Sequence, residues 1–138
     1  MEKIIVKSSA FVNFGEIPVK YSCNGEGKMP QVSWRTKAVV QSYIVYILDE
    51  TVGFVHFVMY NIPGAHNTLI DGVLGDNSAG YRGYYPICPK DGITHLYSIN
   101  VIGINTVINI KNPTLYNILN SIKTNIVAEG KLSGYYSI

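Results

Sequence analysis

Only one stretch of this chain has the periodicity of a helix, and its other apolar runs have the composition of strands. From Leu115 to Ile122, apolar residues recur every three or four positions. Asn112 is a good N-cap, and Pro113 suits the first helical position. We therefore expect a helix that begins near Asn112, and we expect its apolar stripe to pack in the core.

The other apolar runs are rich in β-branched and aromatic residues, and Gly, Pro and Asn cluster between them as breakers. These runs predict strands over residues 42–49, 53–62, 94–105 and 106–112, and the tail 126–138 is strand-like although glycines interrupt it. Many strands and one clear helix favour a mainly β fold over an alternating α/β fold. We expect an antiparallel-rich β-sandwich with one or two short helices.

The length and the charge pattern narrow the class of protein further. The 138 residues show no internal repeat, linker or low-complexity tract, so we expect a single domain that spans residues 1–138. Eleven Lys and Arg residues are scattered singly and give a net charge of only +2, which does not suit a nucleic-acid-binding face. No apolar run has the length of a membrane-spanning helix, so we expect no membrane insertion.

Two cysteines, Cys23 and Cys88, are the only ones in the chain. The N-terminal segment lacks the long apolar core of a secretion signal, and a core of this size needs no disulfide framework. We therefore expect a cytoplasmic protein with two free thiols. A bridge between Cys23 and Cys88 is the alternative.

Asp49 and His56 are the first candidates for a functional site. If residues 42–49 and 53–62 form a hairpin with the loop Glu50–Gly53, Asp49 lies opposite Phe54 and shares a face of the sheet with Phe54 and His56. A loop one residue longer or shorter would separate Asp49 from His56. The alternative is an aspartate at a turn and a histidine satisfied in the core.

His95 and Tyr97 are the second candidates. They lie two residues apart on a predicted strand and face the same way, behind the stiff loop "GYRGYYPICPKDGIT". Together they supply hydrogen-bond donors and an aromatic wall, which suits the rim of a pocket. The alternative is a buried pair with a purely structural hydrogen bond.

Several enzyme chemistries fit the sequence poorly. No G-x-S-x-G motif marks a nucleophilic serine, and nothing in the sequence activates Cys88 as a partner of His95. No C-x-x-C or H-x-x-x-H pair indicates a metal, so we expect neither a metal nor a cofactor. His66 is interpreted as a loop histidine.

Four blocks of the sequence, in order, carry a resemblance to a known family. They are "FGEIPVKYSCNGEGKMPQVSW" (14–34), "ILDETVGFVHFVMYNIPG" (47–64), "GYRGYYPICPKDGITHLYSINV" (80–101) and "AEGKLSGYYS" (128–137). Together they resemble the phosphatidylethanolamine-binding protein family, also called Raf-kinase-inhibitor-like, in its short prokaryotic type. Where the family usually reads Asp-Pro-Asp-x-Pro, this chain has "DET", so Asp49 matches the first aspartate and the second aspartate and both prolines are absent. In the third block, "GYYPICP" stands in place of a tighter Gly-Pro-x-Pro, and Leu96 replaces an arginine.

The resemblance implies a small anion pocket at one end of the central sheet of a β-sandwich. Carried over by position, the ligand-binding residues are Asp49, Phe54, His56, Tyr81, Pro86, His95 and Tyr97. The implied function is a non-enzymatic binding and regulatory module for phosphate or a phospholipid headgroup such as phosphoethanolamine, with a kinase or serine protease as a protein partner. The alternatives are a hydrolase that uses Asp49 and the histidines for acid/base work, and a protease inhibitor that acts through a surface loop.

Overall fold

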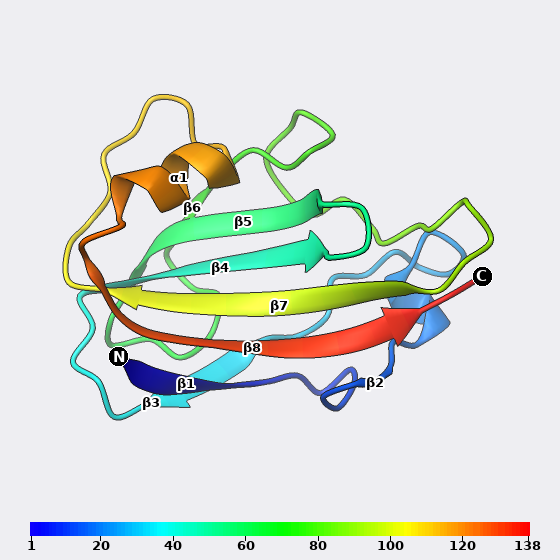
Figure 1. Ribbon diagram of the computed structural model, residues 1–138, viewed down its shortest axis with the longest axis horizontal. Helices are drawn as coiled ribbons and strands as arrows, with labels where there is room; N and C mark the ends of the chain where they lie inside the picture. The colour runs from blue at the N-terminus through cyan, green and yellow to red at the C-terminus, as the bar shows by residue number, and fades with distance from the viewer.

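The strands form one mixed sheet in the computed structural model, which describes residues 1–138 (Figure 1). The sheet order is β3 (Ser33–Thr36), β1 (Glu2–Lys7), β8 (Ile126–Tyr136), β7 (His95–Ile104), β4 (Ser42–Asp49), β5 (Phe54–Pro63) and β6 (Val73–Leu74), and β2 (Gly15–Glu16) also pairs with β8. Neighbouring strands are antiparallel, except that β8 runs parallel to β1 and to β2. The helices are a 3-10 turn, η1 (Val19–Tyr21), and α1 (Leu115–Ser121).

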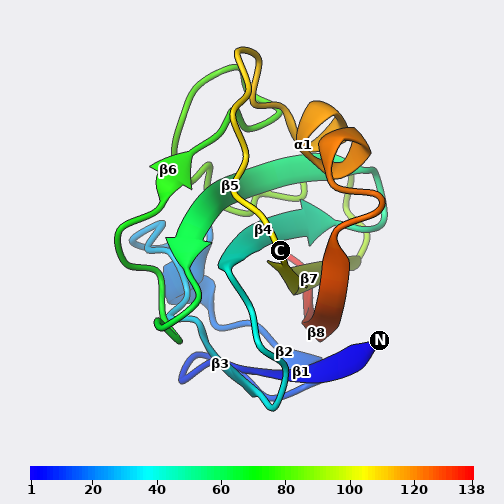
Figure 2. The same ribbon diagram turned by 90° about the vertical axis from the view of Figure 1, so that its left-hand side faces the viewer.

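The sheet curls into a sandwich, because β3 returns to face β4 (Figure 2). Three strands separate β3 from β4 in the sheet order, which would put them about 19 Å apart in a flat sheet. The rings of Trp34 in β3 and Tyr43 in β4 nevertheless lie 5.2 Å apart. The backbone N–H of Trp34 also donates to Asn67, in the loop that follows β5, at 3.1 Å. The mainly β sandwich predicted from the sequence is confirmed.

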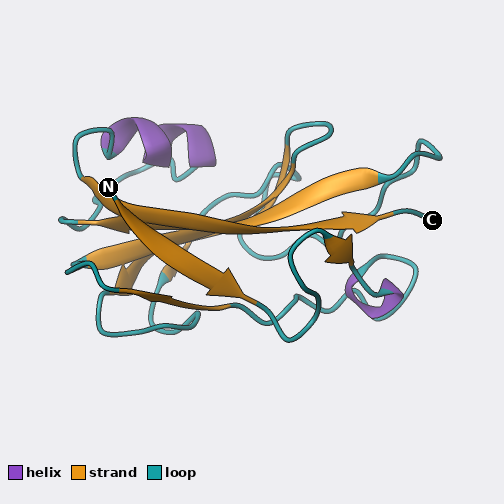
Figure 3. Ribbon diagram, turned by 60° about the horizontal axis from the view of Figure 1, so that its bottom comes forward, coloured by secondary structure: helices purple, strands orange, loops and turns teal.

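Each face of the central strands carries its own apolar cluster. Along β4, Tyr43, Val45 and Ile47 point into the cluster enclosed by the curled sheet, and Ile44 points into the cluster beneath α1. Figure 3 shows α1 lying over one face of the sheet and β3 on the opposite side. Ile118 of α1 is fully buried, so the predicted packing of the helical stripe in the core is confirmed.

The helix begins later than the sequence predicted. α1 begins at Leu115, and its N-cap is Thr114, whose side chain accepts a hydrogen bond from the Asn117 N–H at 3.2 Å. The prediction of Asn112 as the cap was wrong. The Pro113 carbonyl accepts from the N–H of Asp76, which holds the chain extended until Thr114.

Residues 106–112 form no strand, contrary to the sequence prediction. The Asn61 side chain accepts from the Ile108 N–H and donates to the Ile108 carbonyl, both at 2.8 Å. Asn61 has a positive φ of 55° at an irregular point of β5, which allows this contact. A side chain therefore satisfies the Ile108 backbone groups that a neighbouring strand would otherwise bind.

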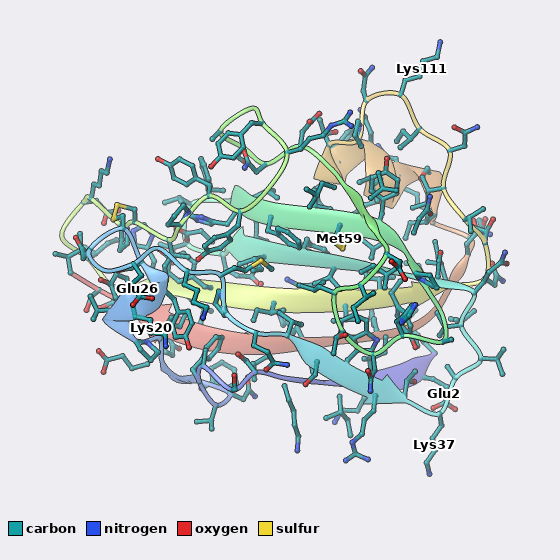
Figure 4. All side chains as sticks on the ribbon, turned by 180° about the vertical axis from the view of Figure 1, so that it is seen from behind. Glu2, Lys20, Glu26, Lys37, Met59 and Lys111 are labelled. Atoms are coloured by element: carbon teal, nitrogen blue, oxygen red, sulfur yellow. A yellow bond between two sulfur atoms is a disulfide. The ribbon has the colours of Figure 1, made fainter.

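Cys23 and Cys88 form a disulfide with a Cα–Cα distance of 5.3 Å, so the expectation of two free thiols was wrong. Their segments are 65 residues apart in sequence but lie side by side, since the Cys23 N–H donates to the Ile87 carbonyl at 3.0 Å. This end of the molecule also carries Lys20 and Glu26 (Figure 4). Disulfides are typical of oxidising compartments, so the prediction of a cytoplasmic location loses one of its grounds.

None of the helices is long and apolar enough to cross a membrane.

Candidate functional site

The β4–β5 hairpin has the register predicted from the sequence. Asp49 lies opposite Phe54 on one side and opposite Tyr97 of β7 on the other. The turn that joins β4 to β5 lies at the right-hand end of these two strands in Figure 1. A bulge follows, in which His56 is an extra residue between the pairs Leu48–Val55 and Ile47–Phe57. The bulge lets both His56 and Phe57 face the enclosed side of the sheet, where strict alternation would allow only one of them.

A cavity of about 440 Å³ opens at this end of the sheet. The strand ends and the turn between β4 and β5 supply half of its lining, and the loop before β7 supplies the rest. The lining residues are Asp49, Val52, Phe54, His56, Tyr85, Cys88, Pro89, Lys90, Asp91 and His95.

His95 is held between two carboxylates. Its Nδ1 lies 2.6 Å from Asp49 Oδ2, and its Nε2 lies 2.8 and 2.9 Å from the two oxygens of Asp91. Burial alone would lower the pKa of His95, but the hydrogen bonds to Asp49 and Asp91 outweigh it and raise the pKa. This geometry favours the imidazolium form of His95, which can donate to a carboxylate through each of its two nitrogens.

His56 has the opposite electrostatic character. Its Nδ1 donates to the backbone carbonyl of Tyr85 at 2.6 Å, and its Nε2 has no hydrogen-bond partner in the chain. Burial lowers the pKa of His56, and the contact with Tyr85 and the charge of Asp49 oppose that effect only in part. The ring is therefore neutral near pH 7 and leaves the lone pair of Nε2 available.

The buried ring of Tyr97 packs against both histidines of the cavity. Its ring centroid is 5.6 Å from that of His56 and 6.2 Å from that of His95. The hydroxyl is buried and has no hydrogen-bond partner. Burial, followed by the negative charge of Asp49, raises the pKa of Tyr97.

The structure brings together most of the residues that the sequence singled out. Asp49, Phe54, His56 and His95 line the cavity, and Tyr97 does not line it but packs against both histidines. Tyr81 and Pro86 do not line it. Tyr81 is exposed and contacts Tyr85, with ring centroids 6.4 Å apart, and Pro86 packs against Gly27. His66 lies in a loop, 3.4 Å from Asp71.

Sequence reasoning missed Tyr85 and Asp91. Tyr85 takes the wall position assigned to Tyr81, because its backbone carbonyl and amide both bond to His56. Asp91 precedes His95 by four residues, a spacing that indicates contact on a helix but predicts nothing in a loop. No group of three or more His, Cys, Asp or Glu side chains is arranged to hold a metal ion.

A cavity with aromatic walls and a few convergent polar side chains has the form that small-ligand sites usually take in proteins. The sequence profile of the phosphatidylethanolamine-binding protein family matches residues 7–137. The chain belongs to this family.

Individual proteins agree with this assignment. A UPF0098 protein of Methanothermobacter thermautotrophicus is 28% identical, over 95% of this chain and 97% of the relative. The crystal structure of a phosphatidylethanolamine-binding protein homologue from Chlamydia trachomatis superimposes with a TM-score of 0.89 at 27% identity, covering 100% of this chain and 99% of that one. YbcL of E. coli has the same fold, with a TM-score of 0.85, 20% identity and 98% of each chain covered.

Proposed function

We propose that the protein is a binding module whose cavity takes a small phosphorylated ligand, of the kind of phosphoethanolamine. The observation that carries this proposal is that His56 and His95 lie in one cavity between aromatic walls, with carboxylates on both ring nitrogens of His95 and a free Nε2 on His56. The family's name, phosphatidylethanolamine-binding, supports the same ligand class.

His56 is the histidine with a ring nitrogen free to contact a phosphate group. Neutral His56 presents the lone pair of Nε2, which accepts the proton of a phosphate monoanion and then donates it back as a charge-assisted hydrogen bond. The second pKa of a phosphate ester is about 6, so such a shared proton is available near neutral pH. Lys90 adds a positive charge at the wall, and the rings of Phe54 and Tyr85 offer faces to an ammonium group.

Binding is favoured over the hydrolase alternative by the state of Cys88. This residue carries the only sulfur at the cavity wall, and the disulfide to Cys23 removes it as a nucleophile. Neutral His56, whose Nε2 has no hydrogen-bond partner in the chain, is the residue that a hydrolase would use as a general base, so a screen against phosphate and carboxyl esters distinguishes the two functions. Regulation of a kinase or a serine protease is the wider role that family membership suggests, with the cavity as its ligand switch.

Titration with phosphoethanolamine tests the binding proposal. The ring signals of His56 and His95 in the NMR spectrum should move together on one binding curve, with a dissociation constant of roughly millimolar to micromolar for so small a ligand. His56→Ala or His95→Ala should weaken binding by roughly tenfold or more, which corresponds to the loss of one charge-assisted hydrogen bond.

His66 provides the control for that experiment, because it lies outside the cavity beside Asp71. Its ring signal should stay fixed during the titration, and His66→Ala should bind as the parent does. The proposal fails if His56→Ala and His95→Ala both fold normally and bind with unchanged affinity.

A further inference from the structure

The anion-binding side of His95 is already occupied by a carboxylate of the chain itself. Asp91 places both carboxylate oxygens within 2.9 Å of His95 Nε2, the nitrogen that Asp49 leaves free. An oxyanion that seeks a charge-assisted hydrogen bond from His95 would have to take this position. Asp91 thus makes the contact that a phosphate would make.

The two carboxylates on His95 differ in how firmly they are held. The Asp49 side chain is only 4% exposed, and its Oδ1 accepts from the N–H groups of Thr51 and Val52 at 3.0 and 3.3 Å. The Asp91 side chain is 45% exposed, and its one other hydrogen bond is from the Ile93 N–H at 3.2 Å. Asp91 can therefore move into water without leaving a buried charge unpaired, whereas Asp49 cannot.

We propose that Asp91 is an internal, exchangeable ligand of the cavity, and that an anion binds by displacing its carboxylate from His95 Nε2. This inference rests on the proposed function and adds its regulation. A tethered carboxylate competes at an effective concentration on the order of millimolar, so only an anion that binds His95 and His56 together displaces it efficiently. Asp91 thereby sets the threshold affinity and excludes simple carboxylates.

The central variant is Asp91→Asn, which keeps the shape of the side chain and removes its charge. The matched control is Asp71→Asn, which makes the same change beside His66, outside the cavity. Phosphoethanolamine is titrated into the parent and both variants at fixed ionic strength and pH. Glycerophosphoethanolamine, a phosphodiester with the same ammonium group and one negative charge fewer, is titrated in parallel.

Asp91→Asn should tighten binding of both ligands by roughly tenfold, the value of one charge-assisted hydrogen bond that no longer has to be broken. The gain in affinity should be the same for both ligands, because the substitution removes the same internal competitor in each case. If the substitution acted only by making the cavity more positive, the gain in affinity would be larger for phosphoethanolamine, the dianionic monoester, than for the diester. In the parent, the Ile93 N–H signal should shift along the same binding curve as His95, because Asp91 releases it.

Each remaining outcome identifies what has failed. Equal affinity of the parent and Asp91→Asn, with the His56 and His95 signals still responding, overturns the exchange and leaves the proposed function standing. A larger gain for the monoester than for the diester, matched by Asp71→Asn, reduces Asp91 to a general charge effect and also overturns the exchange. No response of either histidine in any variant overturns both proposals.

Discussion

At the residue scale, two buried tyrosines on neighbouring strands differ in one respect. The Tyr136 hydroxyl is hydrogen-bonded to Ser22 Oγ at 2.7 Å and accepts from the Asn24 amide at 2.9 Å. The Tyr97 hydroxyl, also buried, has no partner at hydrogen-bonding distance, and its only polar interaction is the longer one with the Asp49 carboxylate that helps to raise its pKa. A buried hydroxyl without a hydrogen bond lowers the stability of the fold, because it has lost its hydrogen bonds to water and gained none in the protein. The hydroxyl of Tyr97 is therefore less well satisfied than the hydroxyl of Tyr136.

This difference predicts opposite effects of two matched substitutions on the free energy of unfolding. Tyr136→Phe should lower it by about 1 kcal/mol, because the substitution breaks hydrogen bonds that are satisfied in the fold. Tyr97→Phe should leave it unchanged or raise it by up to about 1 kcal/mol, because it removes an unpaired polar group. Urea unfolding of both variants measures the two values. A clear loss for Tyr97→Phe would mean that its hydroxyl has a partner in solution.

The histidine pKa values predict a second residue-scale result. His95 should titrate above the ordinary value of about 6.5 and His56 below it, since carboxylates hold the proton on His95 and burial disfavours it on His56. A raised pKa in the folded state gives stability that is present below the ordinary value and lost as pH rises through the raised one. Because the Asp49 carboxylate helps to hold the proton on His95, Asp49→Asn should lower the pKa of His95, which NMR measures from the ring signals. A His95 midpoint at or below 6.5 in the parent would contradict the arrangement.

The site could be predicted from sequence as far as strand geometry determines it. The pairing of Asp49 with Phe54 and the common face of His95 and Tyr97 follow from the period of two along a strand. Asp91 could not be predicted, because its position depends on the path of a loop, and a loop has no period that relates spacing to direction. Tyr81 also lies in this loop, and the sequence could not predict that its side chain would not line the cavity.

At the element scale, the start of α1 gives a test that separates two neighbouring cap candidates. Thr114→Ala should destabilise the protein by about 1 kcal/mol, because the N–H of Asn117 loses its acceptor. Asn112→Ala should change stability by less than about 0.5 kcal/mol, since the hydrogen bond at Asn112 uses its backbone carbonyl. Thermal unfolding of the two variants, side by side, measures the difference. An equal loss in both would restore Asn112 as a cap.

The elements themselves were predictable where local sequence alone determines them. β4, β5 and β7 were predicted to within a residue or two, because each combines β-branched residues with flanking breakers. Residues 106–112 have the same composition, but the Asn61 side chain takes the backbone groups of Ile108. That partner is 47 residues away, so no local pattern reveals it.

At the scale of the whole molecule, the Cys23–Cys88 disulfide joins a segment near the N-terminus to the cavity wall. Closing a loop of 65 residues restricts the unfolded chain by about 4 kcal/mol in the loop-entropy account. Reduction with a dithiol should lower the free energy of unfolding by about that amount, measured in urea with and without the reductant.

The double variant Cys23→Ala/Cys88→Ala is the control for this experiment and should show no response to the dithiol. A thiol count on denatured, unreduced protein should give zero. Two reactive thiols would contradict the disulfide.

The place of β8 in the sheet bears on the order in which the molecule can assemble. β8 is the last strand in the chain, yet it lies between β1, the first, and β7, so the β1–β3 pair joins the rest of the sheet only through it. More than a hundred residues are synthesised between β1, which carries Ile4 and Val6, and the strand that covers these two side chains. Pairing over such a separation makes folding slow and leaves an apolar edge exposed while the chain is made. An unpaired strand edge of this kind is prone to aggregation, so the pairing of β8 with β1 is the step that protects the molecule.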